Sequence, residues 1–161
     1  GVPKDRVIAA HGNFDSAGCI DCGKEVCMGV MGDGIMAGRV VRCEDADCDG
    51  LVKPSIVFFG EQLPERFWNS LKPDFEASDL LIVMGSSLVV QPFASLVERT
   101  RGGVPRVLIN REAVGRWRRG VSEEPDRDYM LLGDCDEMIE ALCAELGWGE
   151  DLDLLASQRE K

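Results

Sequence analysis

The sequence predicts an α/β fold, made of a partial parallel sheet with helices on both faces and a small metal-binding module. Short apolar runs alternate with helical patterns between residues 53 and 149, which is typical of parallel strands covered by helices. Residues 13–52 differ, because they are rich in glycine, cysteine and aspartate and show little periodicity. We therefore expect the sheet to use residues 1–12 and 53–149, the module to use residues 13–52, and residues 150–161 to form a tail.

The bulk composition describes one acidic, globular protein. The chain has 161 residues, of which 45% are hydrophobic, so it is long enough to bury a core. A net charge of -11 argues against direct binding of nucleic acid and favours basic partners such as lysine-rich peptides. No apolar run is long enough to span a bilayer and no signal peptide opens the chain, so we expect a soluble protein without a membrane partner.

The cysteines predict a metal site. Seven cysteines at uneven spacing do not suggest a disulfide framework and indicate a reducing compartment. Four of them form two close pairs: Cys19, Cys22, Cys43 and Cys48. Because the module has too few apolar residues for a core of its own, we predict a structural Zn²⁺ held by these four thiolates. Cys27 could replace one ligand, and two unrelated buried thiol pairs are the alternative.

A glycine-rich segment in this module matches the letters of a dinucleotide-binding turn. Gly32, Gly34 and Ala37 have the required spacing, but no strand precedes them and no amphipathic helix follows. We therefore expect a flexible glycine loop between the two cysteine pairs.

Five short apolar runs predict strands, each ended by glycine or a polar residue. They are residues 7–10, 56–59, 80–84, 107–109 and 129–132. The first run would deliver His11, the only histidine of the chain, to the carboxyl end of a strand.

Helices are predicted from Pro64, from Pro92 and after Asp134, which with Glu137 resembles a capping box. The inward side chains that we expect on them are Phe67, Trp68, Leu71, Phe93, Leu96, Val97, Met138, Ile139, Leu142, Cys143 and Leu146.

Polar residues stand where the predicted strands end. Ser86 and Ser87 follow one strand, and Asn110 and Glu112 follow the next. The carboxyl edge of a parallel sheet is where nucleotides bind, so the serines could contact a phosphate at the next helix start. Asn110 and Glu112 could hold a ribose and an adenine edge.

Six short motifs occur in the order of one known family. They are His11-Gly12 before the paired cysteines, Val52-Lys-Pro54, Val57-Phe-Phe-Gly-Glu61, Gly85-Ser-Ser-Leu88 with Val90 and Pro92, Leu108-Ile-Asn-Arg-Glu112, and Gly133-Asp-Cys135. From about Ile8 to Trp148 the chain resembles the sirtuins, NAD-dependent protein lysine deacylases, and it is most similar to their eukaryotic, class I-like branch that deacetylates histones and tubulin. The resemblance implies a Rossmann-like sheet beside the zinc module, with NAD as co-substrate.

The resemblance also implies a role for each matched residue. His11 would be the general base that accepts a proton from the NAD ribose, a task suited to a side chain with an ordinary pKa of about 6.5. The residues implied to contact NAD are Gly85, Ser86, Ser87, Asn110, Arg111, Glu112 and Cys135. The residues implied to hold the acetyl-lysine peptide as an added strand are Val57, Phe58, Phe59, Gly60, Glu61, Leu88 and Val90.

The sequence departs from the family pattern in two ways. Ser86 stands where the family usually has threonine, which keeps the hydroxyl. The glycine-rich phosphate loop and the nicotinamide pocket, which in the family precede the histidine, have no counterpart in these 161 residues. We therefore expect a truncated deacetylase with little activity alone, which in the whole protein removes acetyl groups from lysine and releases nicotinamide and O-acetyl-ADP-ribose in the cytoplasm or nucleus. The alternative is a non-catalytic, zinc-stabilised fragment that binds a nucleotide or a partner, and in either case unpaired strands would expose apolar surface.

Overall fold

A computed structural model describes residues 2–119 and 127–158. The chain divides into two compact units, Gly1–Lys72 and Pro73–Lys161. The division into domains at 1–12 with 53–149, 13–52 and 150–161 stays a prediction. A parallel sheet with helices is present and four cysteines lie close together, so the predicted fold class, α/β with a small zinc-binding module, is confirmed.

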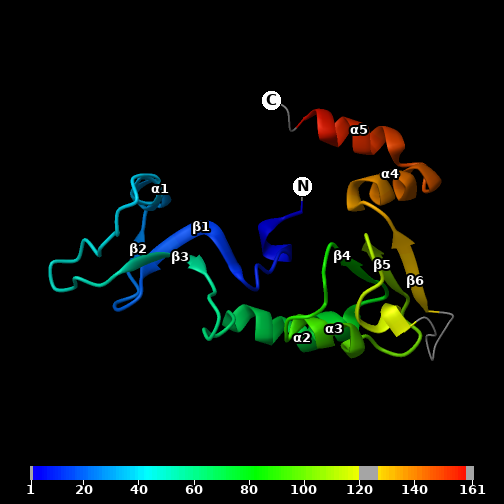
Figure 1. The fold of residues 1–161 in the computed structure, drawn as a ribbon, viewed down its shortest axis with the longest axis horizontal. Helices are drawn as coiled ribbons and strands as arrows, with labels where there is room; N and C mark the ends of the chain where they lie inside the picture. The colour runs from blue at the N-terminus through cyan, green and yellow to red at the C-terminus, as the bar shows by residue number, and fades with distance from the viewer. Residues whose placement is uncertain (1, 120–126, 159–161) are drawn as a thin grey trace. The chain divides into compact units, whose positions relative to one another are not determined.

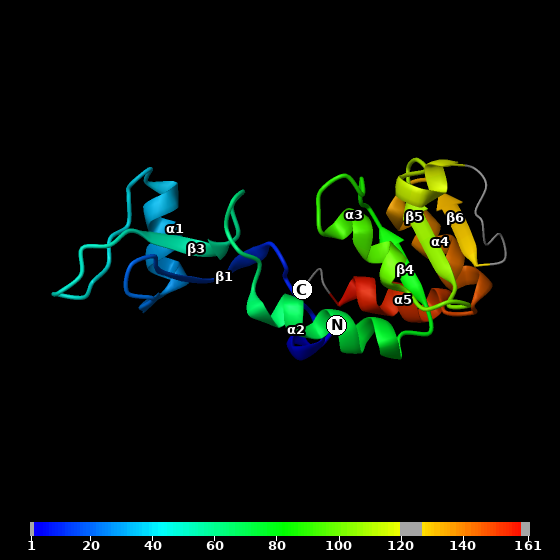
Figure 2. The same ribbon diagram turned by 90° about the horizontal axis from the view of Figure 1, so that it is seen from below.

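The first unit is built on a three-stranded antiparallel sheet with the order β2-β1-β3. Its strands are β1 (Gly12–Cys19), β2 (Glu25–Val26) and β3 (Val52–Ile56), and a short 3-10 turn, η1 (Lys4–Arg6), precedes them. Helix α1 (Met28–Met36) packs on β1 and β3, as Figure 2 shows. The core between the sheet and α1 is small: its buried members are Ala17, Cys19, Met31 and Val52.

Two predicted strands of this unit are wrong. Residues 7–10 form no strand, and the strand expected at 56–59 is instead β3, which ends at Ile56. β3 pairs with β1 in antiparallel fashion, so it does not enter the parallel sheet that was expected. β3 lies at the edge of its sheet, where Pro54 needs no amide hydrogen bond.

The predicted glycine loop is also wrong, because its residues lie in α1. A Cβ atom at Gly34 would lie 2.2 Å from Cγ2 of Val41. The glycine therefore permits close packing of the helix rather than flexibility, and it does not form the turn of a dinucleotide site.

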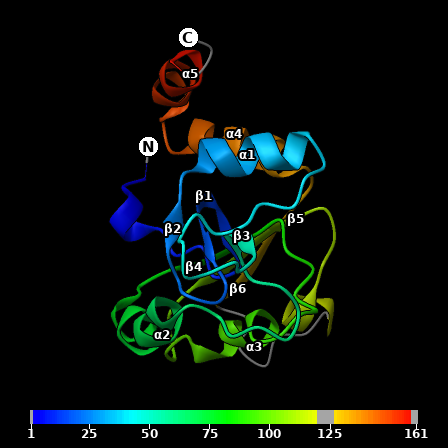
Figure 3. The same ribbon diagram turned by 90° about the vertical axis from the view of Figure 1, so that its left-hand side faces the viewer.

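The second unit contains a three-stranded parallel sheet with the order β4-β5-β6. Its strands are β4 (Leu81–Met84), β5 (Arg106–Asn110) and β6 (Asp128–Leu132), which confirms three of the predicted runs. The helical segments of this unit are α3 (Phe93–Leu96), η2 (Val97–Arg99), η3 (Gly115–Arg119), α4 (Cys135–Glu145) and α5 (Gly149–Ser157). Figures 1 and 3 show α3 on one face of the sheet and α4 on the other, as expected.

The core of the second unit lies on the α3 face of its sheet. Leu108 is fully buried and packs with Val97, Val114 and Trp117. At the amino end of the sheet, the buried guanidinium of Arg106 donates from Nε to Asp128 Oδ1 at 2.6 Å and from Nη2 to Oδ2 at 2.9 Å. This ion pair joins β5 to β6 away from the strands' carboxyl ends.

The predicted inward faces are correct only in part. Helix α2 (Glu65–Ala77) buries Phe67 and Leu71 but leaves Trp68 46% exposed. On α4 the predicted apolar residues are half-buried rather than buried, and Leu146, which follows the helix, is 49% exposed. In the part of the chain that the structure describes, no helix is both long and apolar enough to cross a membrane.

Candidate functional site

The four predicted metal ligands lie together in the first unit. Their Sγ atoms are all within 4.8 Å of one another. The distance between sulfurs is 3.7 Å for Cys19 and Cys48 and 3.6 Å for Cys22 and Cys43. Four sulfurs at about 2.3 Å from a tetrahedral Zn²⁺ are about 3.8 Å apart, whereas a disulfide needs about 2.05 Å. The donor set therefore fits Zn²⁺ and excludes two disulfides.

The surroundings of the sulfurs also fit a cation. The backbone N–H of Cys22 lowers the pKa of Cys19 to about 7. The N–H of Gly50 lowers the pKa of Cys48, but the thiols of Cys22 and Cys19 together with burial raise it to about 12. Thiolates this close repel one another, so a divalent ion among them allows all four to ionise.

Of two residues near the cluster in sequence, Gly50 packs against the sulfurs and Cys27 lies outside their group. Gly50 packs against it so closely that a Cβ atom would lie 2.6 Å from the sulfur of Cys19. Cys27, the possible substitute ligand, precedes α1 and is not part of the four-sulfur group.

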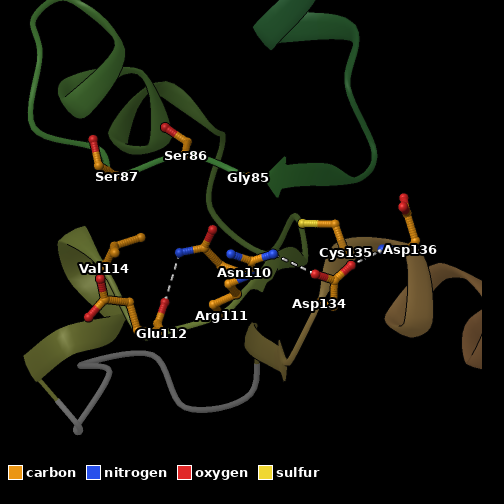
Figure 4. A pocket seen from close by; sticks show the side chains of 10 residues that line it. All are labelled: Gly85, Ser86, Ser87, Asn110, Arg111, Glu112, Val114, Asp134, Cys135 and Asp136. Atoms are coloured by element: carbon orange, nitrogen blue, oxygen red, sulfur yellow. Dashed lines mark hydrogen bonds and ion pairs between the residues drawn. The ribbon is translucent and has the colours of Figure 1, made fainter.

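A second candidate site is a cavity of about 540 Å³ in the second unit, at the carboxyl ends of β4, β5 and β6. This volume lies within the roughly 300–1,000 Å³ of most small-molecule pockets. Figure 4 shows the side chains that gather around it. The lining residues are Gly85, Ser86, Ser87, Asn110, Arg111, Glu112, Val114, Asp134, Cys135 and Asp136.

Hydrogen bonds within and between the segments that follow the strands fix the walls of this pocket. The side-chain amide of Asn110 donates to the carbonyl of Glu112 at 2.9 Å. The Nη2 atom of Arg111 donates to Oδ2 of Asp134 at 2.7 Å, which ties the end of β5 to the start of α4 (Figure 4). This ion pair raises the pKa of Arg111 and lowers that of Asp134. The thiol of Cys135 donates to the carbonyl of Ile109 at 3.5 Å.

The serine turn takes a different form from the one expected. Gly85 has φ +58°, and Oγ of Ser86 accepts a hydrogen bond from the N–H of Leu88 at 3.2 Å. Leu88 itself has φ 48°, an uncommon conformation for a branched side chain. Since α3 begins only at Phe93, Ser86 and Ser87 do not lie at a helix start as predicted. The helix that begins at the pocket is α4.

His11 and the predicted peptide loop belong to the first unit. The exposed His11 lies in a turn just before β1, and its carbonyl accepts a hydrogen bond from Val57 N–H at 2.9 Å. Gly12 follows with φ +70°, and a Cβ atom there would lie 1.7 Å from the carbonyl oxygen of Ser55. The bare backbone of Gly12 thus lets the histidine segment contact the end of β3.

The predicted site residues fall into two groups, one in each unit. All seven residues predicted to contact NAD line this pocket of the second unit. Leu88 and Val90 lie on the turn after Ser87 in that unit, and residues 57–61 lie in the first unit.

Three lining residues were not predicted as such, namely Val114, Asp134 and Asp136. Asp134 was interpreted only as a helix cap, which it is, because its Oδ1 accepts from the N–H of Asp136 at 3.1 Å. The signal that could have found it is its place directly after a strand, beside Cys135.

Comparison with known proteins gives consistent matches. A model of the Sir2 family matches residues 1–92. The NAD-dependent protein deacetylase hst2 of Schizosaccharomyces pombe is 42% identical over 155 residues, covering 96% of this chain and 45% of that protein. NAD-dependent protein deacetylase sirtuin-2 of Danio rerio is 41% identical, over 95% of this chain and 44% of that protein. NAD-dependent protein deacetylase sirtuin-3 of Mus musculus is 43% identical, over 100% of this chain and 47% of that protein. The chain thus spans about half the length of the curated relatives it matches.

Proposed function

Because the chain belongs to the Sir2 family, we propose that it takes part in the NAD-dependent removal of acetyl groups from protein lysines. The observation that carries this proposal is the convergence of the polar ends of three parallel strands on one pocket. The names of its relatives supply the reaction class.

The pocket suits the adenosine half of NAD. The carboxylate of Glu112 can accept hydrogen bonds from ribose hydroxyls, and the amide of Asn110 can contact the same sugar or the adenine edge. Ser86 and Ser87 line the pocket and carry hydroxyls that can donate to a phosphate. Gly85 and Cys135 also line the pocket, and Arg111 is fixed by its hydrogen bond to Asp134.

His11 is the proposed general base. Nicotinamide leaves the ribose when the acetyl oxygen attacks the anomeric carbon, and a ribose hydroxyl then adds to the acetyl carbon. The imidazole of His11 accepts the proton of that hydroxyl, and lysine leaves as the free amine. Addition of one water to the remaining cyclic acyl group then gives O-acetyl-ADP-ribose. A zinc ion held by the four thiolates has a structural role and takes no part in these steps.

The substrate is an acetyl-lysine protein or peptide. Residues 57–61 and 88–90 would bind it as an added strand, through hydrogen bonds that do not depend on the peptide's side chains. The acidity of the chain favours the basic sequences that surround modified lysines. Its free cysteines fit a reducing compartment, so a cytoplasmic or nuclear location is part of the proposal.

A second candidate function is nucleotide binding without turnover. The pocket forms within the second unit alone, and the chain matches only 44–47% of the length of the relatives described above. We therefore expect this chain alone to bind ADP-ribose yet release little nicotinamide from NAD.

Calorimetric titration of the zinc-loaded chain with ADP-ribose tests the proposal. We expect saturable binding, weakened about tenfold or more by Asn110→Ala because a polar partner is lost from the pocket. Asn69→Ala removes the same amide from an exposed position of α2 and should leave the affinity unchanged. Absence of ADP-ribose binding by the wild-type chain would contradict both candidate functions, and rapid nicotinamide release would reject the second.

A further inference from the structure

Lys53, on β3, makes one contact with the end of its own strand and two with the loop that follows. Its Nζ atom donates to the carbonyl of Ile56 at 2.6 Å and to Oε2 of Glu61 at 2.8 Å. The same ammonium group lies 4.7 Å from the ring centroid of Phe58, a cation–π distance. Only 28% of the Lys53 side chain is exposed, so the amine is held beneath the loop rather than extended into solvent.

Glu61 closes the loop from its other end. Its Oε2 atom accepts from Lys53 and also from the backbone N–H of Phe58 at 2.9 Å. The N–H of Glu61 in turn donates to the carbonyl of Phe58 at 3.0 Å. With Gly60 at φ +90°, residues 58–61 form the pattern of a type II turn, which needs a positive φ at its third position.

The turn leaves its tip available to a partner. Phe59 is 98% exposed, an unusual position for a large apolar side chain. Within the described residues, the hydrogen bonds of the turn use the backbone of Val57, Phe58 and Glu61 and leave that of Phe59 and Gly60 unengaged. An extended peptide could therefore pair with the tip while its neighbours stay fixed.

We propose that Lys53 and Glu61 are positioning residues that pre-order the turn 58–61 for binding of an acetyl-lysine peptide. This inference rests on the proposed function. Neither side chain needs to touch the peptide, because both act on the backbone that does. Hydrogen bonds and a cation–π contact that converge on one ammonium group fix a loop that would otherwise lose entropy on binding.

The alternative is a purely stabilising ion pair. Glu61 is 42% exposed, and pairs this accessible add little to the free energy of folding. The two roles therefore predict different results. If the pair positions the turn, its loss should leave the fold largely intact and weaken peptide binding.

The test uses the whole zinc-loaded chain and two ligands, a lysine-rich peptide carrying one acetyl-lysine and ADP-ribose. In Lys53→Met we expect the peptide Kd to rise about tenfold, because the turn must be ordered on binding. The Kd for ADP-ribose, whose pocket lies in the other unit, and the bound zinc should not change. Hydrogen exchange at the Phe58 amide should accelerate, because its acceptor becomes mobile.

Two further variants separate positioning from charge and fold. Lys53→Arg can still pair with Glu61 and should retain most of the peptide affinity. Lys24→Met removes an equally charged residue that pairs with Asp45 at 3.5 Å elsewhere in the unit, and it should behave as wild type. A wild-type chain that binds ADP-ribose but no acetylated peptide would reject the proposed substrate class. If the wild type binds the peptide and Lys53→Met binds it equally well, only the positioning role is overturned.

Discussion

Gly12 decides whether the histidine segment can contact β3. It combines a φ of +70° with a separation of 1.7 Å between an added Cβ and the carbonyl oxygen of Ser55. Gly23 has a similar φ of +74° but open space around it. The two glycines therefore separate backbone strain from steric collision.

Gly12→Ala should unfold the first unit or displace its two strands, whereas Gly23→Ala should cost only the strain of about 1–2 kcal/mol. Thermal unfolding and the hydrogen exchange of the Val57 amide, which donates to His11, measure the two effects. Equal losses of stability in the two variants would mean that the close approach of Gly12 to Ser55 does not matter.

Gly50 has a similar role at the metal centre. Because a Cβ atom would collide with the sulfur of Cys19 and the carboxylate of Asp21, Gly50→Ala should weaken zinc binding about 10- to 100-fold, as is usual for groups that support ligands. Competition with a chromogenic chelator measures this affinity. Gly32→Ala, on α1 with open space around it, is the control and should retain zinc; an unaltered affinity in Gly50→Ala would contradict the packing argument.

The start of α4 depends on Asp134, which caps the helix and pairs with Arg111. Hydrogen bonding to Arg111 and to the N–H of Asp136 lowers the pKa of Asp134, so its ionised form is favoured in the folded protein. The resulting stability is fully present above the unfolded pKa of about 3.9 and is lost as the pH falls through the lower folded value.

Asp134→Asn should therefore lower the unfolding temperature at neutral pH. The difference in unfolding temperature between the variant and the wild type should shrink as the pH falls well below about 3.9. Calorimetric unfolding across this range measures the difference between the two proteins. Asp153→Asn, an exposed position on α5, is the control and should leave the unfolding temperature at neutral pH unchanged. A constant difference at all pH values would show that the charge of Asp134 is irrelevant.

Parallel strands were easier to predict than the elements of the module. The runs that became β4, β5 and β6 are continuous, apolar and ended by polar residues, which is the pattern of parallel strands covered by helices. The run at 7–10 is also short and apolar, yet it forms no strand. Helix α1 was missed because three glycines argue against a helix, whereas the close packing of Gly34 on Val41 favours it.

The pocket could be predicted because parallel strands end at a common edge, so residues far apart in sequence must meet there. What the sequence could not provide was the set of bonds that give the pocket its walls. The pairing of Arg111 with Asp134 depends on a side-chain direction across two strands, and the backbone of Leu88 at φ 48° has no local signature.

The two units rely on different sources of stability. In the first unit, the core around the sheet has four buried residues, one of which is the metal ligand Cys19, whereas the second unit buries Leu108, Ile109 and a paired Arg106. A structural zinc ion contributes on the order of 10 kcal/mol to folding in small domains. The first unit should therefore need the metal, and the second should not.

Removal of zinc with a chelator should collapse the amide resonances of residues 2–72 while those of the second unit persist, along with ADP-ribose binding. Nuclear magnetic resonance with and without chelator checks both outcomes, and re-addition of Zn²⁺ should restore the spectrum. Loss of all resonances together would show that the units fold as one.

In the described residues, β4 and β6 form the two outer strands of the parallel sheet. Their half-exposed apolar side chains include Ile82, Met84, Met130 and Leu132. Association along these strands would favour the folded form by mass action. The midpoint of thermal denaturation should then rise with protein concentration. A melting temperature of this chain would therefore have a meaning only at a stated concentration.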